Sequence, residues 1–251
     1  MITDQQRGEI VARLLAARQG GPLFDPAGIA IDHADVLAIQ AGVMAALGPV
    51  GGWKVGRGAP DQPIIFAPIR ASGIAAAPKL WPREDSRLCG LELEIAFRID
   101  SALPPLDAPD YAAKLAASVT PLPVFEVLDS RLLNMETTDA HWRLADMQIN
   151  AGMITGTAYD KPWQPNDFIR LNGELIADAS IVVDGLLTQP GGSPFDLLIE
   201  LLRQVKDHCG GVQPGQIVTT GAFTGLRFFK PGTRLRGSFA GMAPLEMMFG
   251  A

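Results

Sequence analysis

Two glutamates separated by a single residue provide the clearest chemical signal in this sequence. Glu92 and Glu94 lie in the run 90–97, in which every second residue from Leu91 to Phe97 is apolar. In a β-strand this alternation places the apolar side chains on one face and both carboxylates on the other, with their Cα atoms about 6.7 Å apart. Two such carboxylates could bind one cation. The alternative is a half-buried strand with a solvated acidic face, which spacing alone favours because glutamate is usually exposed.

A third carboxylate occurs in a similarly apolar run, since Glu126 lies within residues 121–128. Burying a glutamate there is costly unless it is paired or bound to a metal. Three carboxylates without cysteine or histidine ligands would favour magnesium, manganese or calcium over zinc. The alternative is a structural ion pair in which Arg131 binds Glu126 or Asp129.

Lys54 is the second candidate, in the glycine-flanked run 51–56. It stands between a tryptophan and a valine, so it is either an exposed strand residue or an ammonium group held in a pocket for an anionic substrate. Taken alone, the residue favours the exposed position. The three histidines show no ligand spacing, and we expect them at the surface or at helix ends: His33, His141 and His208.

The elements that must position these residues begin with two helices. The first runs from about Gln5 to Arg18, and the second follows the capping residue Asp32 and ends at Gly48. Residues 1–48 are therefore expected to form a small helical N-terminal section, with the catalytic domain over residues 49–251.

Short β-rich runs dominate the remainder, at residues 52–55, 64–67, 91–99, 124–128 and 217–220. Asn172-Gly173 predicts a two-residue hairpin turn. Two further helices are expected, from about Pro109 to Ala117 and from Ser193 to Gly210-Gly211. Because the strands do not alternate strictly with helices, the pattern indicates a mixed, curved sheet with flanking helices and disfavours a doubly wound parallel sheet.

Composition narrows the classes of partner and location. The chain has 251 residues, enough for one large domain or a small lobe with a main one, and its net charge is −6. Without a basic stripe, neither nucleic acid nor an anionic membrane is an expected partner. Cys89 and Cys209 are too far apart for a C-x-x-C motif, which favours a reducing compartment. No signal-like N-terminus and no long apolar run occur, so we expect a cytoplasmic protein.

Four motifs in order resemble the fumarylacetoacetate hydrolase superfamily, in its 2-keto-4-pentenoate hydratase branch. They are residues 52–56 (Gly-Trp-Lys-Val-Gly), the Glu92-x-Glu94 strand, residues 126–131 (Glu-Val-Leu-Asp-Ser-Arg) and residues 215–221 (Gly-Gln-Ile-Val-Thr-Thr-Gly). Their order and spacing match over about residues 35–249, which is nearly the whole chain. No single motif is decisive, but the ordered set is fairly specific.

The resemblance implies an α+β fold, a mixed β-roll with flanking helices and the small helical N-terminal section. It also implies that Glu92, Glu94 and Glu126 bind Mg²⁺ or Mn²⁺ and that Lys54 is the catalytic lysine. Substrates in the family are small 2-oxo or 2-hydroxy-dienoic acids, which can chelate a metal through the 1-carboxylate and the 2-oxygen. A metal polarising the 2-oxygen would stabilise the enolate that forms as protons move along the chain.

The sequence departs from the hydratase branch in two places. The branch carries an acidic pair after the lysine strand, whereas this chain reads Phe-Ala-Pro-Ile-Arg-Ala-Ser over residues 66–72. Arg70 stands where acid is expected, which predicts a longer or dicarboxylic substrate whose second carboxylate binds Arg70. The alternative, which the residue type favours equally, is a solvent-exposed arginine. The second departure replaces the branch's Asp-Asn pair and serines by residues 145–152. Thr220 and Gly221, in a glycine-rich turn, are further candidates for closing the substrate pocket, although each residue taken separately favours a plain loop.

The expected activity is that of a lyase, a hydratase converting a 2-hydroxy-2,4-dienoate to a 4-hydroxy-2-oxo acid, in a homo-oligomer. Within the superfamily the alternatives are decarboxylation of a 2-oxo acid and, below it, carbon-carbon hydrolysis, which needs a general base for water. A third alternative is a non-catalytic 2-oxo acid binder that has lost the proton-transfer acid near Arg70.

Overall fold

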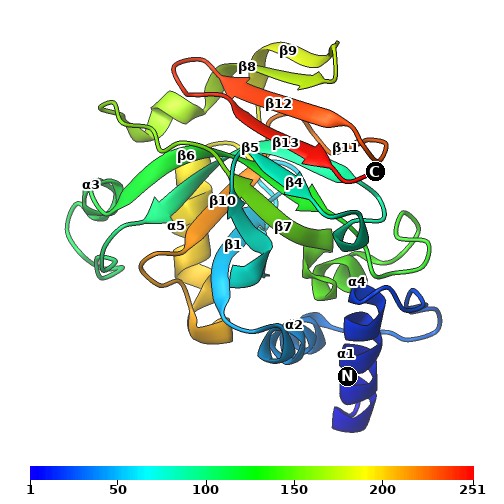
Figure 1. Ribbon diagram of the computed structural model, residues 1–251. Coiled ribbons are helices and arrows are strands. Elements are labelled where there is room, and N and C mark those ends of the chain that lie inside the picture. Colours follow the sequence, from blue (N-terminus) through cyan, green and yellow to red (C-terminus); the bar gives the residue numbers. More distant parts are fainter.

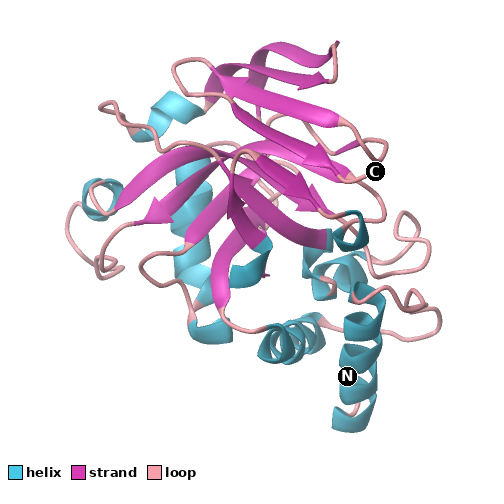
Figure 2. Ribbon diagram, in the orientation of Figure 1, coloured by secondary structure: helices cyan, strands magenta, loops and turns pink.

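A computed structural model describes residues 1–251 as an α+β fold built from two mixed sheets with helices around them (Figures 1 and 2). The helices are α1 (Asp4–Arg18), α2 (His33–Leu47), α3 (Tyr111–Ala116), α4 (Ala140–Ala145) and α5 (Pro194–Val205). The strands are β1 (Val50–Gly56), β2 (Ile65–Arg70), β3 (Ile74–Ala76), β4 (Lys79–Trp81), β5 (Gly90–Ile99), β6 (Val119–Leu128), β7 (Asn150–Thr155), β8 (Arg170–Ala177), β9 (Ser180–Thr188), β10 (Ile217–Ala222), β11 (Arg227–Phe228), β12 (Arg234–Phe239) and β13 (Leu245–Phe249). The expected fold class is confirmed.

The larger sheet has the order β2-β1-β10-β5-β6-β7-β3, and β11 pairs with the end of β5. β1 runs parallel to β10, whereas β10, β5, β6 and β7 pair in antiparallel fashion, so the sheet is mixed as expected. The long strands β5 and β6 lie at its centre, and α5 packs against β10, β1 and β5. These central strands carry the three glutamates of the sequence analysis.

The smaller sheet has the order β4-β13-β12-β8-β9 and lies across the larger one at the top of Figure 1. The main apolar core contains 33 buried residues drawn from both sheets and from α5. Gly237 in β12 permits a close approach, because a Cβ atom there would lie 2.7 Å from the Phe125 ring of β6. At this point the backbone of β12, in the smaller sheet, therefore packs directly against a side chain of β6, in the larger sheet.

The expected N-terminal helices are confirmed, with their starts fixed by side-chain caps. Thr3 caps α1 and forms a reciprocal pair of hydrogen bonds with Gln6. Asp32 caps α2 in the same way with Asp35. Both caps satisfy backbone N–H groups that the first turn of a helix leaves free. Ser193 caps α5, which ends at Val205, several residues before the expected glycines.

The prediction of a hairpin turn at Asn172-Gly173 is wrong. Both residues lie inside the continuous strand β8, and the chain reverses between Ala177 and Ser180. The turn contains Asp178, whose φ is +53°, a left-handed conformation that aspartate tolerates better than most residues. Gly173 serves packing instead, since a Cβ atom there would lie 2.8 Å from Leu187 and 2.9 Å from Phe239.

The N-terminal helices share a second apolar cluster with the rest of the chain. Residues of α1 and α2 pack with Phe24, Ala67, Leu132 and Trp142 in a group of 13 buried side chains. The expected boundary at residue 48 falls between α2 and β1. None of the helices is both long enough and apolar enough to cross a membrane.

Candidate metal centre

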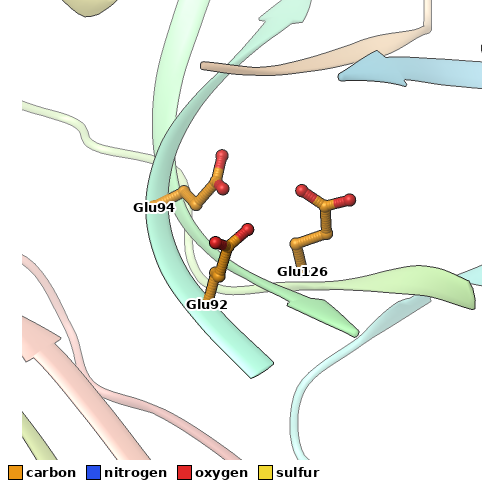
Figure 3. A group of neighbouring side chains, drawn as sticks. All are labelled: Glu92, Glu94 and Glu126. Carbon is orange, nitrogen blue, oxygen red and sulfur yellow. The ribbon is translucent and has the colours of Figure 1, made fainter. Parts of the chain in front are cut away.

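The three glutamates meet because β5 and β6 are neighbours in the larger sheet. Glu92 of β5 lies directly opposite Glu126 of β6 in the antiparallel register. Glu94 lies two residues further along β5, and therefore on the same face as Glu92. One carboxylate oxygen from each of the three residues lies within 4.8 Å of the others, and the three side chains point toward one another (Figure 3).

The acidic face of β5 is covered, so the alternative of a solvated acidic face is wrong. Glu94 and Glu126 are each 1% exposed, and Glu92 is half-buried. The alternating apolar residues from Leu91 to Phe97 are also buried on the opposite face. A strand with both faces covered must satisfy its buried charges within the protein or through a ligand.

Glu94 and Glu126 are held by hydrogen bonds from two other strands, β10 and β7. The Thr219 hydroxyl and the Gly221 N–H, at 2.8 Å, both donate to Glu94 Oε2. Asn150 Nδ2 donates to Glu126 Oε1 at 2.8 Å. Glu126 Oε2, by contrast, is buried without any hydrogen-bond partner. The donors fix two carboxylates in orientation and leave one buried oxygen free.

Lys54 reaches the same group of carboxylates from β1. Its Nζ lies 2.5 Å from Glu126 Oε1 and donates to the Gln148 carbonyl at 3.1 Å. The side chain is only 12% exposed, so Lys54 is an ammonium held in a pocket and not the exposed strand residue that its type alone favours. β1 positions it through its parallel pairing with β10, in which Lys54 lies opposite Thr219.

The ionisation of these groups reflects burial and their mutual charges. Burial, followed by the charge of Glu126, raises the pKa of Glu92 to about 7. Burial and the charges of Glu126 and Glu92 raise the pKa of Glu94 well above its usual range. Burial alone would lower the pKa of Lys54, but the charges of Glu126, Glu92 and Glu94 outweigh it, so that pKa is raised. Lys54 is therefore protonated, and it lies beside carboxyl groups whose ionised forms are disfavoured.

This arrangement fits a hard divalent cation. Three carboxylates converge around one ammonium, so two of them have no compensating cation when they are ionised. Glu126 Oε2 is a buried acceptor that receives no hydrogen bond. The atoms that could bind a cation at the point of convergence are all carboxylate oxygens. Such a set suits Mg²⁺ or Mn²⁺, which prefer carboxylate oxygen, over Zn²⁺, which prefers nitrogen and sulfur.

A cavity of about 180 Å³ opens beside the carboxylates. Its lining includes the three glutamates, Lys54, Gly221 and two residues that the sequence analysis did not single out, Arg57 and Gln148. A larger hollow of about 500 Å³ lies between Asp25 and Trp142, but it contains no comparable group of metal-type ligands. The chemistry of the molecule is therefore concentrated in the smaller cavity.

The three expected substrate-binding residues lie in different surroundings. Gly221 lines the cavity, with φ of +98°, and donates its N–H to Glu94. The Thr220 hydroxyl donates to the Ile95 carbonyl at 2.7 Å, so it supports the strand pair. Arg70 ends β2 opposite Val50, whereas Lys54 pairs with Ala67 nearer the middle of that strand. Arg70 is not among the residues that line the cavity, and its Nε is buried without a partner.

Several residues of the site have no local signal in the sequence. Thr219 and Asn150 reach the glutamates only through the pairing of distant strands. Gln148 lies in a turn in which Met147, Gln148 and Ile149 all have positive φ values of 49° to 56°. Non-glycine residues adopt this conformation at a cost of roughly 1–2 kcal/mol each. The only sequence signal near this turn is that residues 145–152 replace the Asp-Asn pair and serines of the hydratase branch.

The buried ion pair next to the site also differs from the expected one. Arg131 pairs with Asp146, with Nε 2.5 Å from Oδ1, and not with Glu126 or the Asp129 carboxylate. Its Nη1 donates to the Asp129 backbone carbonyl instead. This pairing leaves the Glu126 carboxylate free to face Lys54 and the other glutamates, because Arg131 is drawn to the start of the left-handed turn.

Comparison with known proteins gives matches in structure only. No protein-family model and no curated protein matches the sequence. 4-Oxalocrotonate decarboxylase from Pseudomonas putida G7, solved with magnesium and adipate, superposes with a TM-score of 0.81 at 18% identity, over 99% of each chain. Fumarylpyruvate hydrolase from Pseudomonas aeruginosa, solved with Mn²⁺ and pyruvate, gives a TM-score of 0.54 at 16% identity, over 79% of this chain and 88% of that one.

A yeast fumarylacetoacetate hydrolase family protein matches with a TM-score of 0.55 at 13% identity, over 79% of this chain and 91% of that one. These matches show that the chain has the fumarylacetoacetate hydrolase fold, which confirms the expected mixed β-roll. The decarboxylase match spans 99% of both chains, so it includes the two sheets and the N-terminal helices.

Proposed function

We propose that the chain is a divalent-metal-dependent lyase that hydrates a 2-hydroxy-2,4-dienoate to a 4-hydroxy-2-oxo acid. Glu92, Glu94 and Glu126 would hold Mg²⁺ or Mn²⁺. The observation that carries the proposal is the convergence of three carboxylates, two of them fully buried, on one ammonium beside a cavity. When bound, the cation supplies positive charge next to the carboxylate and 2-oxygen of the substrate as an enolate develops.

Lys54 is the proton carrier in this proposal. As an ammonium it delivers a proton from Nζ to the terminal carbon of the diene. The neutral amine then accepts a proton from the water that adds to the fourth carbon, which gives the enol of the product. Transfer of the 2-hydroxyl proton to the third carbon then gives the 4-hydroxy-2-oxo acid. The Gln148 carbonyl and Glu126 hold Nζ in place for both transfers. One lysine can serve both steps, because the two transfers run in opposite directions and restore its charge.

The glutamate donors keep the site in one geometry. Thr219 and Gly221 orient Glu94, and Asn150 orients Glu126. Gly221 also lines the substrate cavity, and a side chain there would be strained because its φ is +98°. We therefore include Gly221 among the substrate-binding residues. Fixed ligands of this kind reduce the reorganisation needed when charge develops on the substrate.

Decarboxylation is the second candidate, and two observations favour it. No carboxylate other than the three glutamates lines the cavity, so the acid that the hydratase branch carries after the lysine strand has no counterpart here. The match that spans 99% of both chains is to a decarboxylase. Loss of CO₂ from a 2-oxo-enedioate needs the electron sink but no base to activate water.

The test offers the purified protein two substrates, each with and without added Mg²⁺ or Mn²⁺. Hydration predicts that 2-hydroxypenta-2,4-dienoate is converted to 4-hydroxy-2-oxopentanoate only with the metal, as detected by loss of diene absorbance and by NMR of the product. Decarboxylation predicts CO₂ release from 2-oxohex-3-enedioate instead. Binding of both acids with no product from either would contradict both candidates and leave the binding protein as the remaining alternative.

A further inference from the structure

Arg57 is a second cation in the cavity that the proposed mechanism does not use. It follows β1 directly, three residues after Lys54, and lines the same cavity as the three glutamates. Its side chain is only 11% exposed. A guanidinium group in this position is costly to bury unless its donors are used, so its hydrogen bonds indicate what the group is for.

Two hydrogen bonds fix the Arg57 guanidinium and leave part of it free. Nε donates to the Gly191 carbonyl at 2.8 Å, and Nη1 pairs with Glu200 Oε1 at 2.8 Å. The structure shows no hydrogen bond from Nη2. Glu200 lies on α5 and is 31% exposed, so solvent screens its charge more than that of the groups inside the cavity. Arg57 is therefore a preoriented cation with an unused donor.

The charges around the cavity determine which ligand end could reach Arg57. Lys54 is engaged by Glu126 and Gln148, and the other charged groups in the lining are the three glutamates. A ligand whose first carboxylate lies near the glutamates through a shared cation would have any second carboxylate repelled by them. Of the two cationic residues in the lining, Lys54 pairs with one of the three glutamates, whereas Arg57 pairs with Glu200 outside them. A distal anionic group is therefore directed toward Arg57.

We propose that Arg57 binds the distal carboxylate of a dicarboxylic 2-oxo or 2-hydroxy-dienoic substrate. This inference rests on the proposed function and adds to it the substrate class. A guanidinium paired with that carboxylate stabilises its charge, so the distal carboxylate is retained in the product, as hydration requires, and is not lost as CO₂. Arg57 thus takes the role that residue type and position suggested for Arg70, which lies outside the cavity lining.

The test measures binding of matched 2-oxo acids to Mn²⁺-loaded protein by calorimetry. The pairs have equal carbon counts: 2-oxoadipate with 2-oxohexanoate, and 2-oxoglutarate with 2-oxopentanoate. Oxalate, which has no distal group, reports on the metal end alone. Wild type should bind at least one dicarboxylate about tenfold or more tighter than its partner, since one charge-assisted pair gives a preference of this order. Arg57→Met should remove that preference and leave oxalate binding unchanged.

The controls separate this inference from the proposed function. Arg98→Met removes an exposed arginine of β5 and should keep the full preference. Glu200→Gln removes the competing carboxylate and should keep or increase it. If wild type binds oxalate but does not distinguish the pairs, or if Arg57→Met retains the preference, the role of Arg57 is wrong and the proposed function stands. If wild type binds neither oxalate nor any 2-oxo acid, the proposed function fails first.

Discussion

At the scale of single residues, the proposed chemistry depends on which charges are paired. Lys54 and Glu126 form a buried pair, while Glu92 and Glu94 have no cation of their own. When both are ionised, their negative charge is buried where water cannot stabilise it well. A divalent cation would offset this charge directly, and the ammonium of Lys54 would then be available for proton transfer.

Replacing Lys54 by methionine tests the proton-transfer role, because methionine keeps the stem and removes only the ammonium. We expect kcat to fall by roughly 100-fold or more with KM nearly unchanged, since an acid-base group acts in the transition state. Steady-state kinetics with the dienoate substrate checks this. Lys114→Met, at an exposed lysine of α3, is the matched control. Unaltered kcat and KM in Lys54→Met would remove Lys54 from the mechanism.

The raised pKa values predict how metal stabilisation depends on pH. The pKa of Glu92 rises from 4.5 to about 7 in the folded protein, so the metal-free folded state binds more protons than the unfolded state between these values. Its contribution to stability is fully present below pH 4.5 and is lost as the pH rises through about 7. Metal ligands must be deprotonated to bind.

We therefore expect excess Mn²⁺ to raise Tm more at about pH 8 than at about pH 5.5, where protons compete for the carboxylates. Thermal melts with and without Mn²⁺ at both pH values measure the difference. Glu92→Gln should flatten this pH dependence. An equal rise in Tm at both pH values in wild type would show that the three carboxylates do not bind the ion.

At the scale of elements, the strands were predictable and the turns were not. Alternating apolar residues located β5 to within one residue, because successive side chains of a strand point to opposite faces. The expected run at 124–128 matched only the second half of β6, which begins at Val119. The Asn172-Gly173 pair misled the prediction, since Gly173 is required for packing against Phe239 and not for a turn. Helix α4 was not predicted, because six residues carry too little periodicity.

The β8–β9 hairpin gives a direct test of that correction. Gly173→Ala should destabilise the protein by about 1–3 kcal/mol, because the added methyl group would overlap Leu187 and Phe239. Asp178→Asn, at the observed turn, should be within about 0.5 kcal/mol of wild type, since asparagine tolerates a positive φ. Chemical denaturation compares the two. A neutral Gly173→Ala would contradict the packing role of Gly173.

The site itself was only partly predictable from the sequence, because part of it is formed by tertiary contacts that leave no local pattern. Glu92, Glu94 and Glu126 could be found because a glutamate within an apolar strand conflicts with its surroundings. Their orienting partners Thr219 and Asn150 have ordinary types, and only the strand order β10-β5-β6-β7 brings them close. Arg57 and the left-handed turn at Gln148 likewise depend on tertiary contacts that no local pattern records.

At the scale of the whole molecule, the N-terminal helices and the β-roll share buried contacts. Gln40 of α2 donates to the Leu144 carbonyl at 2.8 Å and pairs with His208 at 2.9 Å. Arg18 of α1 donates to the backbone carbonyl of Asn150 at 3.4 Å. Asn150 is the first residue of β7, and its side chain orients Glu126. Helix α1 therefore contacts a residue that holds one of the three glutamates in place.

These shared contacts predict that the chain unfolds as one cooperative unit. Calorimetry should show a single transition whose calorimetric and van't Hoff enthalpies agree, because separating α1 and α2 would expose the common apolar cluster. Far-UV dichroism and tryptophan fluorescence, which reports on buried Trp53 and Trp142, should give the same midpoint. Two resolved transitions would indicate that residues 1–48 form an independent domain.

Titration of the metal-free protein with Mn²⁺ measures whether Glu92, Glu94 and Glu126 bind one divalent cation. We expect one Mn²⁺ per chain. Glu126→Gln should weaken binding by at least about tenfold, since even residues that only support a metal ligand have effects of 10–100-fold. Glu136→Gln, at an exposed loop position, should bind as wild type does. No binding by wild type, or equal binding by Glu126→Gln, would show that the three glutamates do not form a metal site.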